Sequence, residues 1–289
     1  MDFPDYFADA NSGFNEAEFV IFGVPYDKTS SFRYGSKYAP NKIRQSSWNF
    51  ETFNIKNCID FRDIKVHDYG NVKINDDSPT KMVKKVRELT SKLLEQDKFP
   101  IVLGGEHSIT TGIVQGFPRE TAVLSLDAHI DFRQEYENEP FNHACTTRRI
   151  AEHIDIDNIA LLGIRSAEKE EFEEAKKQGL FWIDSFIIRK KGIEEALYKV
   201  KNYLKNKKIY LTLDIDVLDP AYAPGTSTPE PFGLTPFDIL ECIKIFSNQL
   251  IGFDIVEVCP PYDNGETAIL AARFVKCIIE EIWIRNHQD

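Results

Sequence analysis

The sequence predicts an α/β fold in which a mostly parallel sheet lies between layers of helices. Short apolar runs alternate with longer amphipathic stretches along the whole chain, as expected for repeated strand–helix–strand units. Several of these apolar runs are continuous, which indicates strands that are buried on both faces. The length of 289 residues is also one that a large single α/β domain reaches.

Eight short apolar runs predict the strands, in chain order at residues 18–24, 64–69, 99–103, 122–126, 159–163, 180–183, 209–213 and 251–258. The amphipathic stretches between them predict helices at residues 78–96, 108–115, 145–154, 167–178, 193–205, 236–247 and 266–284. The last helix has Asn264 as its candidate cap and Glu266 in its first turn. Its predicted apolar stripe consists of Ile269, Ala272, Val275, Ile279 and Trp283.

One domain is predicted for residues 1–289. The sequence contains no short-period repeat, no low-complexity tract and no linker rich in Pro, Gly and Ser. Long connections are predicted at residues 27–47, 132–142 and 220–235. We expect the functional residues there, because binding and catalytic groups concentrate on long loops.

The charge balance limits the class of partner. There are 35 Lys and Arg residues against 46 Asp and Glu residues, which gives a net charge of −11. A nucleic acid or an anionic membrane favours a basic surface, so a small molecule is the expected partner. The sequence has no apolar run of about 18 residues and no secretory leader. The protein is therefore expected to be soluble and cytoplasmic.

The cysteines predict no disulfide framework and no thiolate zinc site. Their number is odd and they form no CxxC pair, whereas both kinds of site use regularly spaced or paired cysteines. Reduced and mostly buried thiols are expected for all of them: Cys58, Cys145, Cys242, Cys259 and Cys277.

Three predicted strands end in clusters of carboxylate and imidazole side chains. These clusters are Gly104-Gly105-Glu106-His107, Asp127-Ala128-His129-Ile130-Asp131 and Asp214-Ile215-Asp216. Ligands of an open parallel sheet bind outside the carboxyl ends of the strands. Alternate residues of an extended segment also project to the same side. We therefore expect the four aspartates to converge.

Four converging aspartates beside apolar strands need cations, because buried carboxylates without partners are strongly unfavourable. No Lys or Arg lies within the three clusters, whereas two divalent ions would cancel the four charges. Oxygen-rich ligation with two imidazoles and no thiolate favours Mn²⁺, and Fe²⁺, Co²⁺ and Zn²⁺ stay open. The alternative for each acid is a turn or cap residue, which is what we expect of Asp219.

The histidines divide into two groups. His107, His129 and His143 lie in one short window beside the clusters, and we expect them to be functional. The other three have no such neighbours and are expected to be structural or surface residues: His67, His153 and His287.

At these clusters the sequence resembles the ureohydrolase (arginase/agmatinase) family. The matching metal-binding signatures are GGEHSIT at 104–110, DAHID at 127–131 and DIDVLDP at 214–220, with further similarity at 23–47, 223–231 and 257–263. The resemblance implies a three-layer α/β/α sandwich with a central eight-stranded, mostly parallel sheet, the arginase/deacetylase-like fold. It also implies two Mn²⁺ per chain and a homo-oligomer, a trimer or a hexamer.

The resemblance assigns metal ligands by motif position. One ion would be held by His107 and Asp131 and the other by His129 and Asp216, and both would be bridged by Asp127 and Asp214. A bridging hydroxide would then attack the central carbon of a guanidinium and release urea and an amine.

Two further residues resemble family residues that surround the substrate. His143 is similar to the histidine of the loop after the second signature, and suits proton shuttling or contact with the substrate's distal end. Glu257 resembles the carboxylate that receives the guanidinium. Their alternatives are a helix-cap histidine and a salt-bridged core glutamate. With Asp131 they are the catalytic candidates, and activity is expected to rise with pH as bridging water ionises and His143 loses its proton.

The choice of guanidine depends on the loop at 132–142. Arg133 and the run Phe141-Asn142-His143-Ala144 differ from the arginase pattern and are more similar to the agmatinase branch. The expected reaction is therefore agmatine to putrescine and urea. Arg133 and Asn142 join His143 and Glu257 as candidate substrate contacts.

Other substrates stay open. The loop glutamates Glu135, Glu137 and Glu139 favour a dication, although alternating glutamates are more often a solvated face. Guanidinobutyrate becomes the stronger interpretation if Arg133 faces the pocket unpaired, and N1-aminopropylagmatine and arginine are further alternatives. The departures Ala144-Cys145-Thr146 and Phe232 affect substrate choice more than reaction type.

Two other classes of protein are alternatives. A dinuclear metallophosphatase would show GDxxD and GNH signatures, which the sequence lacks. A non-catalytic metal-binding homologue is disfavoured because every ligand position is filled and Glu257 is present. Cys145 as a nucleophile is also disfavoured, because a metal hydroxide needs no thiol.

Overall fold

The computed structural model describes residues 4–74 and 76–287. Its centre is an eight-stranded sheet with the strand order β4-β1-β5-β10-β9-β6-β7-β8. Every neighbouring pair in this sheet is parallel, so the predicted fold class is confirmed. The prediction of one domain over residues 1–289 stays a prediction.

All eight predicted strands are present in the sheet. Their bounds are β1 Phe19–Gly23, β4 Val66–Asn71, β5 Phe99–Leu103, β6 Ala122–Leu126, β7 Ile159–Ile164, β8 Phe181–Asp184, β9 Ile209–Asp214 and β10 Leu250–Val256. A separate antiparallel pair, β2 (Phe53–Asn54) and β3 (Ile59–Asp60), was not predicted. Its residues are exposed or half-buried and show no apolar run.

The seven predicted helices are also present, several of them with shorter bounds. The α-helices of the described residues are α1 Ala39–Ser47, α2 Pro79–Leu94, α3 Ile109–Val114, α4 Thr146–Ala151, α5 Lys169–Lys177, α6 Ser185–Lys191, α7 Ile193–Leu204, α8 Pro236–Phe246 and α9 Glu266–His287. Single 3₁₀ turns lie at Ser36–Tyr38, Phe61–Asp63, His143–Cys145, Ile156–Asn158, Ile215–Val217 and Pro260–Tyr262.

Two helices correct the sequence-based expectation. The segment 27–47 was expected to be one long connection, but its second half forms α1, which begins with a proline in its first turn and buries Ile43 and Arg44. Its mostly polar composition hid it. Helix α6 begins where the Asp184 carboxylate accepts a hydrogen bond from the Ile187 amide at 2.7 Å. It ends at Gly192, whose φ of 89° separates it from α7.

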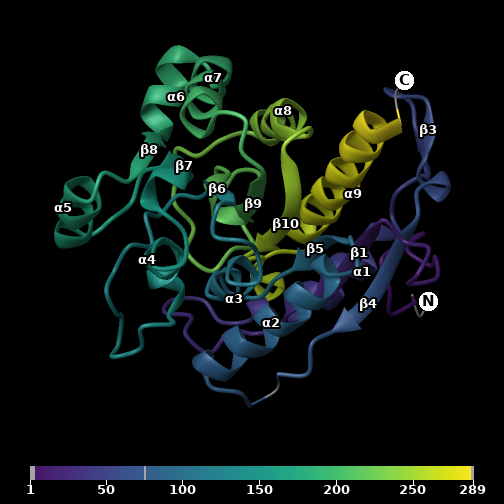
Figure 1. The fold of residues 1–289 in the computed structure, drawn as a ribbon, viewed down its shortest axis with the longest axis horizontal. Helices are drawn as coiled ribbons and strands as arrows, with labels where there is room; N and C mark the ends of the chain where they lie inside the picture. Colours follow the sequence, from purple (N-terminus) through teal and green to yellow (C-terminus); the bar gives the residue numbers. More distant parts are fainter. Residues whose placement is uncertain (1–3, 75, 288–289) are drawn as a thin grey trace.

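The helices form two layers, one on each face of the sheet. Apolar residues of α1, α6, α7, α8 and α9 pack in one core cluster, and those of α2, α3, α4 and α5 pack in the other. Figure 1 shows α6 to α9 in its upper part and α2 to α4 in its lower part. Along β5, Ile101 and Leu103 belong to the first cluster and Val102 to the second, which explains why these strands are continuously apolar.

The start of α9 differs from the prediction. Asn264 was expected to be the cap, but the Asp263 carboxylate accepts hydrogen bonds from the Thr267 amide at 2.8 Å and the Gly265 amide at 2.9 Å. In the predicted stripe, Ile269 is 40% exposed and Trp283 is half-buried, whereas the three residues between them are buried.

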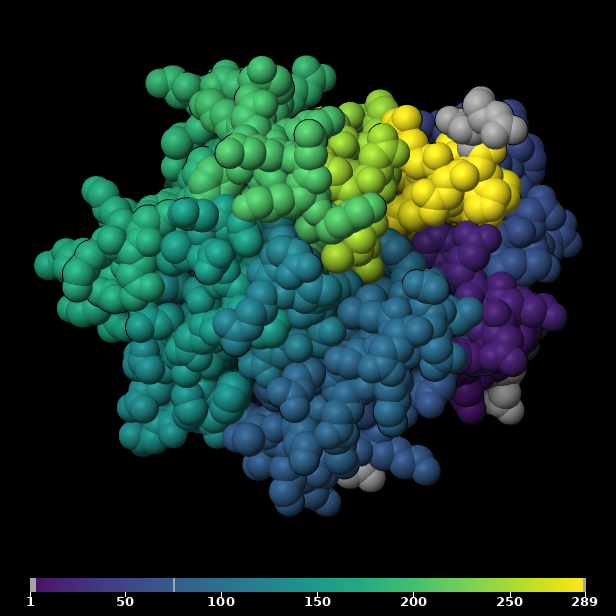
Figure 2. Space-filling view, in the orientation of Figure 1, coloured from purple at the N-terminus to yellow at the C-terminus, as the bar shows by residue number. Residues whose placement is uncertain are grey.

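Helix α9 lies against the N-terminal part of the chain. It packs against α1, and Figure 2 shows the N-terminal part of the chain in purple against the C-terminal helix in yellow. Among the described residues, the helices are either too short or too polar to cross a lipid bilayer.

Candidate metal centre

The three clusters lie at the carboxyl ends of adjoining strands. Strands β5, β10, β9 and β6 are consecutive in the sheet, and each is followed at that end by candidate residues. His107 follows β5, Glu257 follows β10, Asp214 ends β9 and Asp127 follows β6. The strand order therefore gathers groups that are up to 150 residues apart in the chain.

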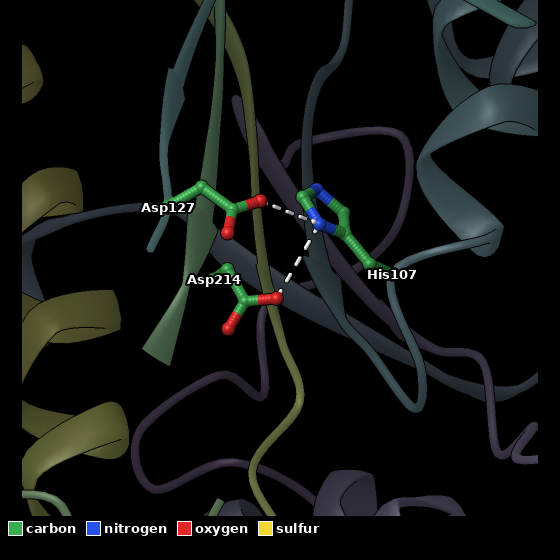
Figure 3. A group of neighbouring side chains, drawn as sticks. All are labelled: His107, Asp127 and Asp214. Carbon is green, nitrogen blue, oxygen red and sulfur yellow. Dashed lines mark ion pairs between the residues drawn. The ribbon is translucent and has the colours of Figure 1, made fainter. Parts of the chain in front are cut away.

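The first group of metal-binding side chains is centred on His107. Its Nδ1 lies 3.1 Å from Asp127 Oδ2, 3.2 Å from Asp131 Oδ2 and 3.3 Å from Asp214 Oδ2. All four residues are buried. Figure 3 shows the His107 ring pointing between the carboxylates of Asp127 and Asp214.

The second group is centred on His129. Its Nδ1 lies 2.9 Å from Asp216 Oδ2 and 3.7 Å from Asp127 Oδ1. Asp127 therefore belongs to both groups, one oxygen to each. The ring's other nitrogen, Nε2, lies 3.7 Å from Glu230 Oε1.

These side chains fit a pair of divalent cations. His107 Nδ1 and Asp127 Oδ2 are buried and have no hydrogen-bond partner among the described residues. Buried polar atoms are otherwise nearly always satisfied, so two orphaned atoms that face each other indicate a missing positive centre. Four carboxylates and two imidazoles without thiolates match the donors that Mn²⁺ and similar ions accept.

Burial and crowding shift the pKa values of this centre. Burial, together with the neighbouring Asp127, raises the pKa of Asp131 to about 7. Burial opposes the charged form of His107, but the nearby carboxylates of Asp127, Asp131 and Asp214 outweigh this and raise the pKa of the ring. Burial and crowding therefore disfavour four charged carboxylates at this centre unless a cation offsets them.

Glu257 lies beside the first group. It is 3% exposed, and its Oε1 accepts a hydrogen bond from the His107 amide at 2.6 Å. Burial raises the pKa of Glu257 to about 8. No salt bridge to it is present among the described residues, so the salt-bridged alternative has no support.

A cavity of about 210 Å³ opens at these strand ends. Five of the six candidate ligands line it, together with three other candidates, Glu257, His143 and Arg133. Asp127 is buried and does not line it. The remaining lining residues are Ser31, Tyr136, Ala144, Ser166, Glu171 and Thr228.

His143 is held by the loop that precedes α1. Thr29 Oγ1 accepts a hydrogen bond from the His143 amide at 3.0 Å and lies 3.4 Å from its Nδ1, while Ser31 Oγ lies 3.4 Å from its Nε2. Burial lowers the pKa of His143 to about 4. This pKa favours a neutral imidazole between pH 6 and 9. Loss of the His143 proton is therefore not supported as a cause of the expected rise in activity with pH, which stays a prediction that rests on ionisation of the bridging water.

Arg133 lies at the rim of the cavity with its charge paired. Its guanidinium is 2.9 Å from Glu168 and 3.6 Å from Glu171, and it stacks on the Tyr136 ring at 4.8 Å. The condition that would favour guanidinobutyrate, an unpaired Arg133, is therefore not met, because the partners come from α5 and its N-terminus. The three loop glutamates do not line the cavity.

Asn142 turns away from the cavity. It is 2% exposed, its Oδ1 accepts a hydrogen bond from the Ala144 amide at 3.1 Å, and its Nδ2 donates to the Tyr136 carbonyl at 3.4 Å. These contacts cap the 3₁₀ turn of His143. Burial raises the pKa of the neighbouring Cys145 thiol to about 12, which makes it a poor nucleophile.

The residues expected to be structural have structural contacts. The Asp219 carboxylate accepts hydrogen bonds from the Ala221 amide of its own turn at 3.0 Å and from the Phe232 and Gly233 amides at 2.7 and 3.2 Å. His67 and His153 contact the backbone carbonyls of Ser12 and Phe117 at 2.8 and 3.0 Å.

The sequence analysis missed Glu106 as a residue that organises the site. It is completely buried and accepts hydrogen bonds from the Thr29 hydroxyl at 2.6 Å, the Thr29 amide at 2.7 Å and the Ser108 hydroxyl at 2.5 Å. It therefore fixes the loop that holds His143. Its position next to His107 was the available signal. Glu230, beside His129, was missed because no strand precedes it.

The fold and the site define an α/β protein with Asp and His metal-binding groups at the carboxyl ends of its strands. Residues 17–280 match the Arginase family. The chain belongs to the arginase family, as the three signatures indicated.

Similar proteins narrow the assignment within the family. The chain is 36% identical over 277 residues to an agmatinase of Bacillus cereus, with 93% of each chain covered. It is 34% identical over 271 residues to the N(1)-aminopropylagmatine ureohydrolase of Thermococcus kodakarensis, covering 90% of this chain and 89% of the relative. The crystal structure of the agmatine ureohydrolase of Thermoplasma volcanium superposes with a TM-score of 0.92 at 39% identity, covering 99% and 98% of the two chains. The chain is thus an agmatinase-like ureohydrolase that acts on guanidino C–N bonds.

Proposed function

We propose that this enzyme hydrolyses agmatine to putrescine and urea with two Mn²⁺ ions. The observation that carries the proposal is that one cavity of about 210 Å³ is lined by residues of both metal-binding groups, by the buried Glu257 and by His143. A small guanidine fills such a space while touching all of them. The protein similarity to agmatinases supports the same substrate.

The proposed ligands combine the two groups of side chains, which share Asp127, with the family resemblance, which adds Asp214 as a second shared ligand. His107, Asp131 and shared Asp127 and Asp214 would hold one ion, and His129 and Asp216 with the same shared pair would hold the other. Bound there, two ions would lower the pKa of a water molecule between them and so supply the nucleophile. Mn²⁺ is proposed over Zn²⁺ because the donors are mostly oxygen and include no thiolate.

Glu257 would bind the guanidinium. A carboxylate accepts two parallel N–H bonds from this planar cation, and in the cavity it lies beside His107. Burial raises the pKa of the Glu257 carboxyl. A bound guanidinium would favour the ionised form, because it supplies the positive partner that the buried carboxylate lacks. This orients the central carbon toward the metal-binding groups.

His143 would handle the proton that the leaving amine requires. The ring is neutral at physiological pH and lines the cavity. A neutral imidazole at the reaction centre accepts a proton and returns it to the departing nitrogen. The proposed role of Asp131 in catalysis is that of a metal ligand in the first group.

The wall around Arg133 favours an ammonium over a carboxylate at the substrate's distal end. Arg133 contributes one positive charge, and its partners Glu168 and Glu171 contribute two negative charges. An anionic tail would have to displace one of these partners. Guanidinobutyrate and arginine are therefore weaker candidates than agmatine, although one relative is named a guanidinobutyrase. N1-aminopropylagmatine is the second candidate because its tail is cationic and a relative is named for it.

A panel of guanidines tests the proposal. Purified protein with added Mn²⁺ is incubated with agmatine, N1-aminopropylagmatine, guanidinobutyrate and arginine, and urea release is measured. We expect the highest kcat/KM for agmatine. A higher kcat/KM for another guanidine would identify that compound as the substrate in place of agmatine. Two bound Mn²⁺ per chain without urea release from any of the four would favour the non-catalytic homologue.

Two further properties belong to the same proposal. The enzyme is proposed to work in the cytoplasm as a trimer or a hexamer, as the family resemblance implies. Light scattering of the purified protein measures the number of chains directly.

A further inference from the structure

A buried carboxylate that the proposed reaction does not use lies behind the metal centre. Asp254 on β10 is fully buried and accepts three hydrogen bonds. Thr212 Oγ1 donates to Asp254 Oδ1 at 2.6 Å, and the Tyr210 hydroxyl and Thr110 Oγ1 donate to Oδ2 at 2.6 and 2.9 Å. All the hydroxyls come from neighbouring elements, β9 and α3.

One of these hydroxyls also contacts a proposed metal ligand. Thr212 Oγ1 lies 3.1 Å from Nε2 of His107. The other ring nitrogen, Nδ1, faces the carboxylates of Asp127, Asp131 and Asp214. The imidazole is therefore placed between the metal centre on one side and a hydroxyl–carboxylate pair on the other.

Counting protons fixes which nitrogen of His107 carries the hydrogen. A threonine hydroxyl has one hydrogen to donate, and Thr212 gives it to Asp254 at the shorter distance of 2.6 Å. Thr212 can then only accept from His107, so Nε2 carries the hydrogen. Nδ1 keeps its lone pair for a cation.

We propose that Asp254 is a positioning residue that acts through Thr212 to hold His107 in the tautomer and orientation that bind metal. The inference rests on the proposed metal centre and goes beyond it to residues that touch neither ion nor substrate. Outer partners of a ligating histidine fix its tautomer in this way, and their removal typically weakens metal binding about 10- to 100-fold. Here the partner acts through a hydroxyl relay.

Thr212→Val tests the relay because it has the same shape and lacks the hydroxyl. The full-length protein is stripped with a chelator, and Mn²⁺ binding is measured by calorimetry. We expect the affinity for one of the two ions to fall about 10- to 100-fold, with Thr212→Ser restoring most of it. Asp254→Ala, which removes the acceptor of the Thr212 hydroxyl, should show the same loss as Thr212→Val and gives a second route if either variant folds poorly.

Tyr210→Phe is the matched control. It removes a hydroxyl from the same carboxylate but leaves the contact between Thr212 and His107, so Mn²⁺ affinity should stay near the wild-type value. Wild-type affinity in Thr212→Val, or no recovery in Thr212→Ser, would overturn the inference and leave the proposed metal centre intact. Wild-type protein that binds no divalent ion would overturn both.

Discussion

Glu257 and Asp131 both have backbone angles that ordinary residues avoid, with φ of 60° and 51°. A side chain makes the left-handed region costly, so non-glycine residues stay there where surrounding contacts impose it. The Glu257 amide donates to the Gly105 carbonyl at 2.8 Å, and the Asp131 carbonyl accepts from the Arg148 amide at 3.2 Å. Both carboxylates are thereby directed into the cavity.

Glu257→Gln removes the negative charge of this side chain and keeps one acceptor oxygen. It should lower kcat/KM for agmatine about 10- to 100-fold, because a charge-assisted hydrogen bond contributes about 1.5–3 kcal/mol. Manganese content, measured by plasma mass spectrometry, should not change. Glu135→Gln, in the exposed part of the loop, is the control and should keep full activity. Loss of metal from the Glu257 variant would refute its role as a substrate group.

The pH dependence of kcat/KM tests the role of His143. His143→Gln should lower kcat/KM about 100-fold or more if the ring transfers protons. Because burial lowers the pKa of His143 to about 4, the ring is neutral throughout pH 6–9. The ratio of wild-type to variant kcat/KM should therefore be constant across that range, and it should shrink only as pH falls toward 4. A ratio that grows tenfold from pH 6 to pH 8 would mean that His143 titrates there.

The segment at residues 27–47, expected from the sequence to be a long connection, contacts both the site and the sheet. The loop before α1 supplies Thr29 and Ser31 to His143, and α1 itself is fastened to β4 by Arg44. The Arg44 guanidinium is 2% exposed and binds both oxygens of Asp68, at 2.7 and 2.9 Å. It also donates to Asn71 Oδ1 at 2.6 Å.

We predict that Arg44→Ala destabilises the protein by about 3–5 kcal/mol, because removing one partner leaves a buried charge uncompensated. The free energy of unfolding in urea measures it. Arg62→Ala is the matched control: it breaks another Arg–Asp pair, with Asp60, whose arginine is 65% exposed. Water screens that pair, so its loss should leave stability nearly unchanged. Equal effects of the two variants would contradict the assignment of α1 to the stable core.

At the scale of the whole molecule, the order of the strands creates the site. The chain runs β5, β6, β9, β10, whereas the sheet places β10 between β5 and β9. This crossover sets Glu257 beside His107 and brings Asp214 next to Asp127. A metal centre built from three strands links distant parts of the chain.

Mn²⁺ should therefore stabilise the whole fold. A ligand that binds only the native state adds about 2.7 kcal/mol at a concentration about 100 times its Kd. Thermal unfolding should show a Tm higher by several degrees with Mn²⁺ than with a chelator. Asp214→Asn should lose most of this difference together with urea release. A Tm that responds equally in the variant would contradict the ligand assignment.

The sequence predicted most of the sheet but little of what surrounds the site. Continuous apolar runs such as 99–103 and 122–126 gave strands with the same bounds in the structure, because burial on both faces leaves a strong signal. Helix α1 left no such signal, since most of its residues are polar. The candidates Arg133 and Asn142 were identified by position in a loop, and only their contacts show that one is ion-paired and the other caps a turn.

The sequence by itself determined the α/β class, the three acidic clusters and the need for cations. These features depend on the pattern of apolar and charged residues close together in the chain. The tertiary structure alone decided that β10 enters the sheet between β5 and β9, that Glu106 holds the loop of His143, and that Asp254 stands behind His107. These contacts join residues 77 to 150 positions apart, and their geometry exists only once the strands are ordered and packed.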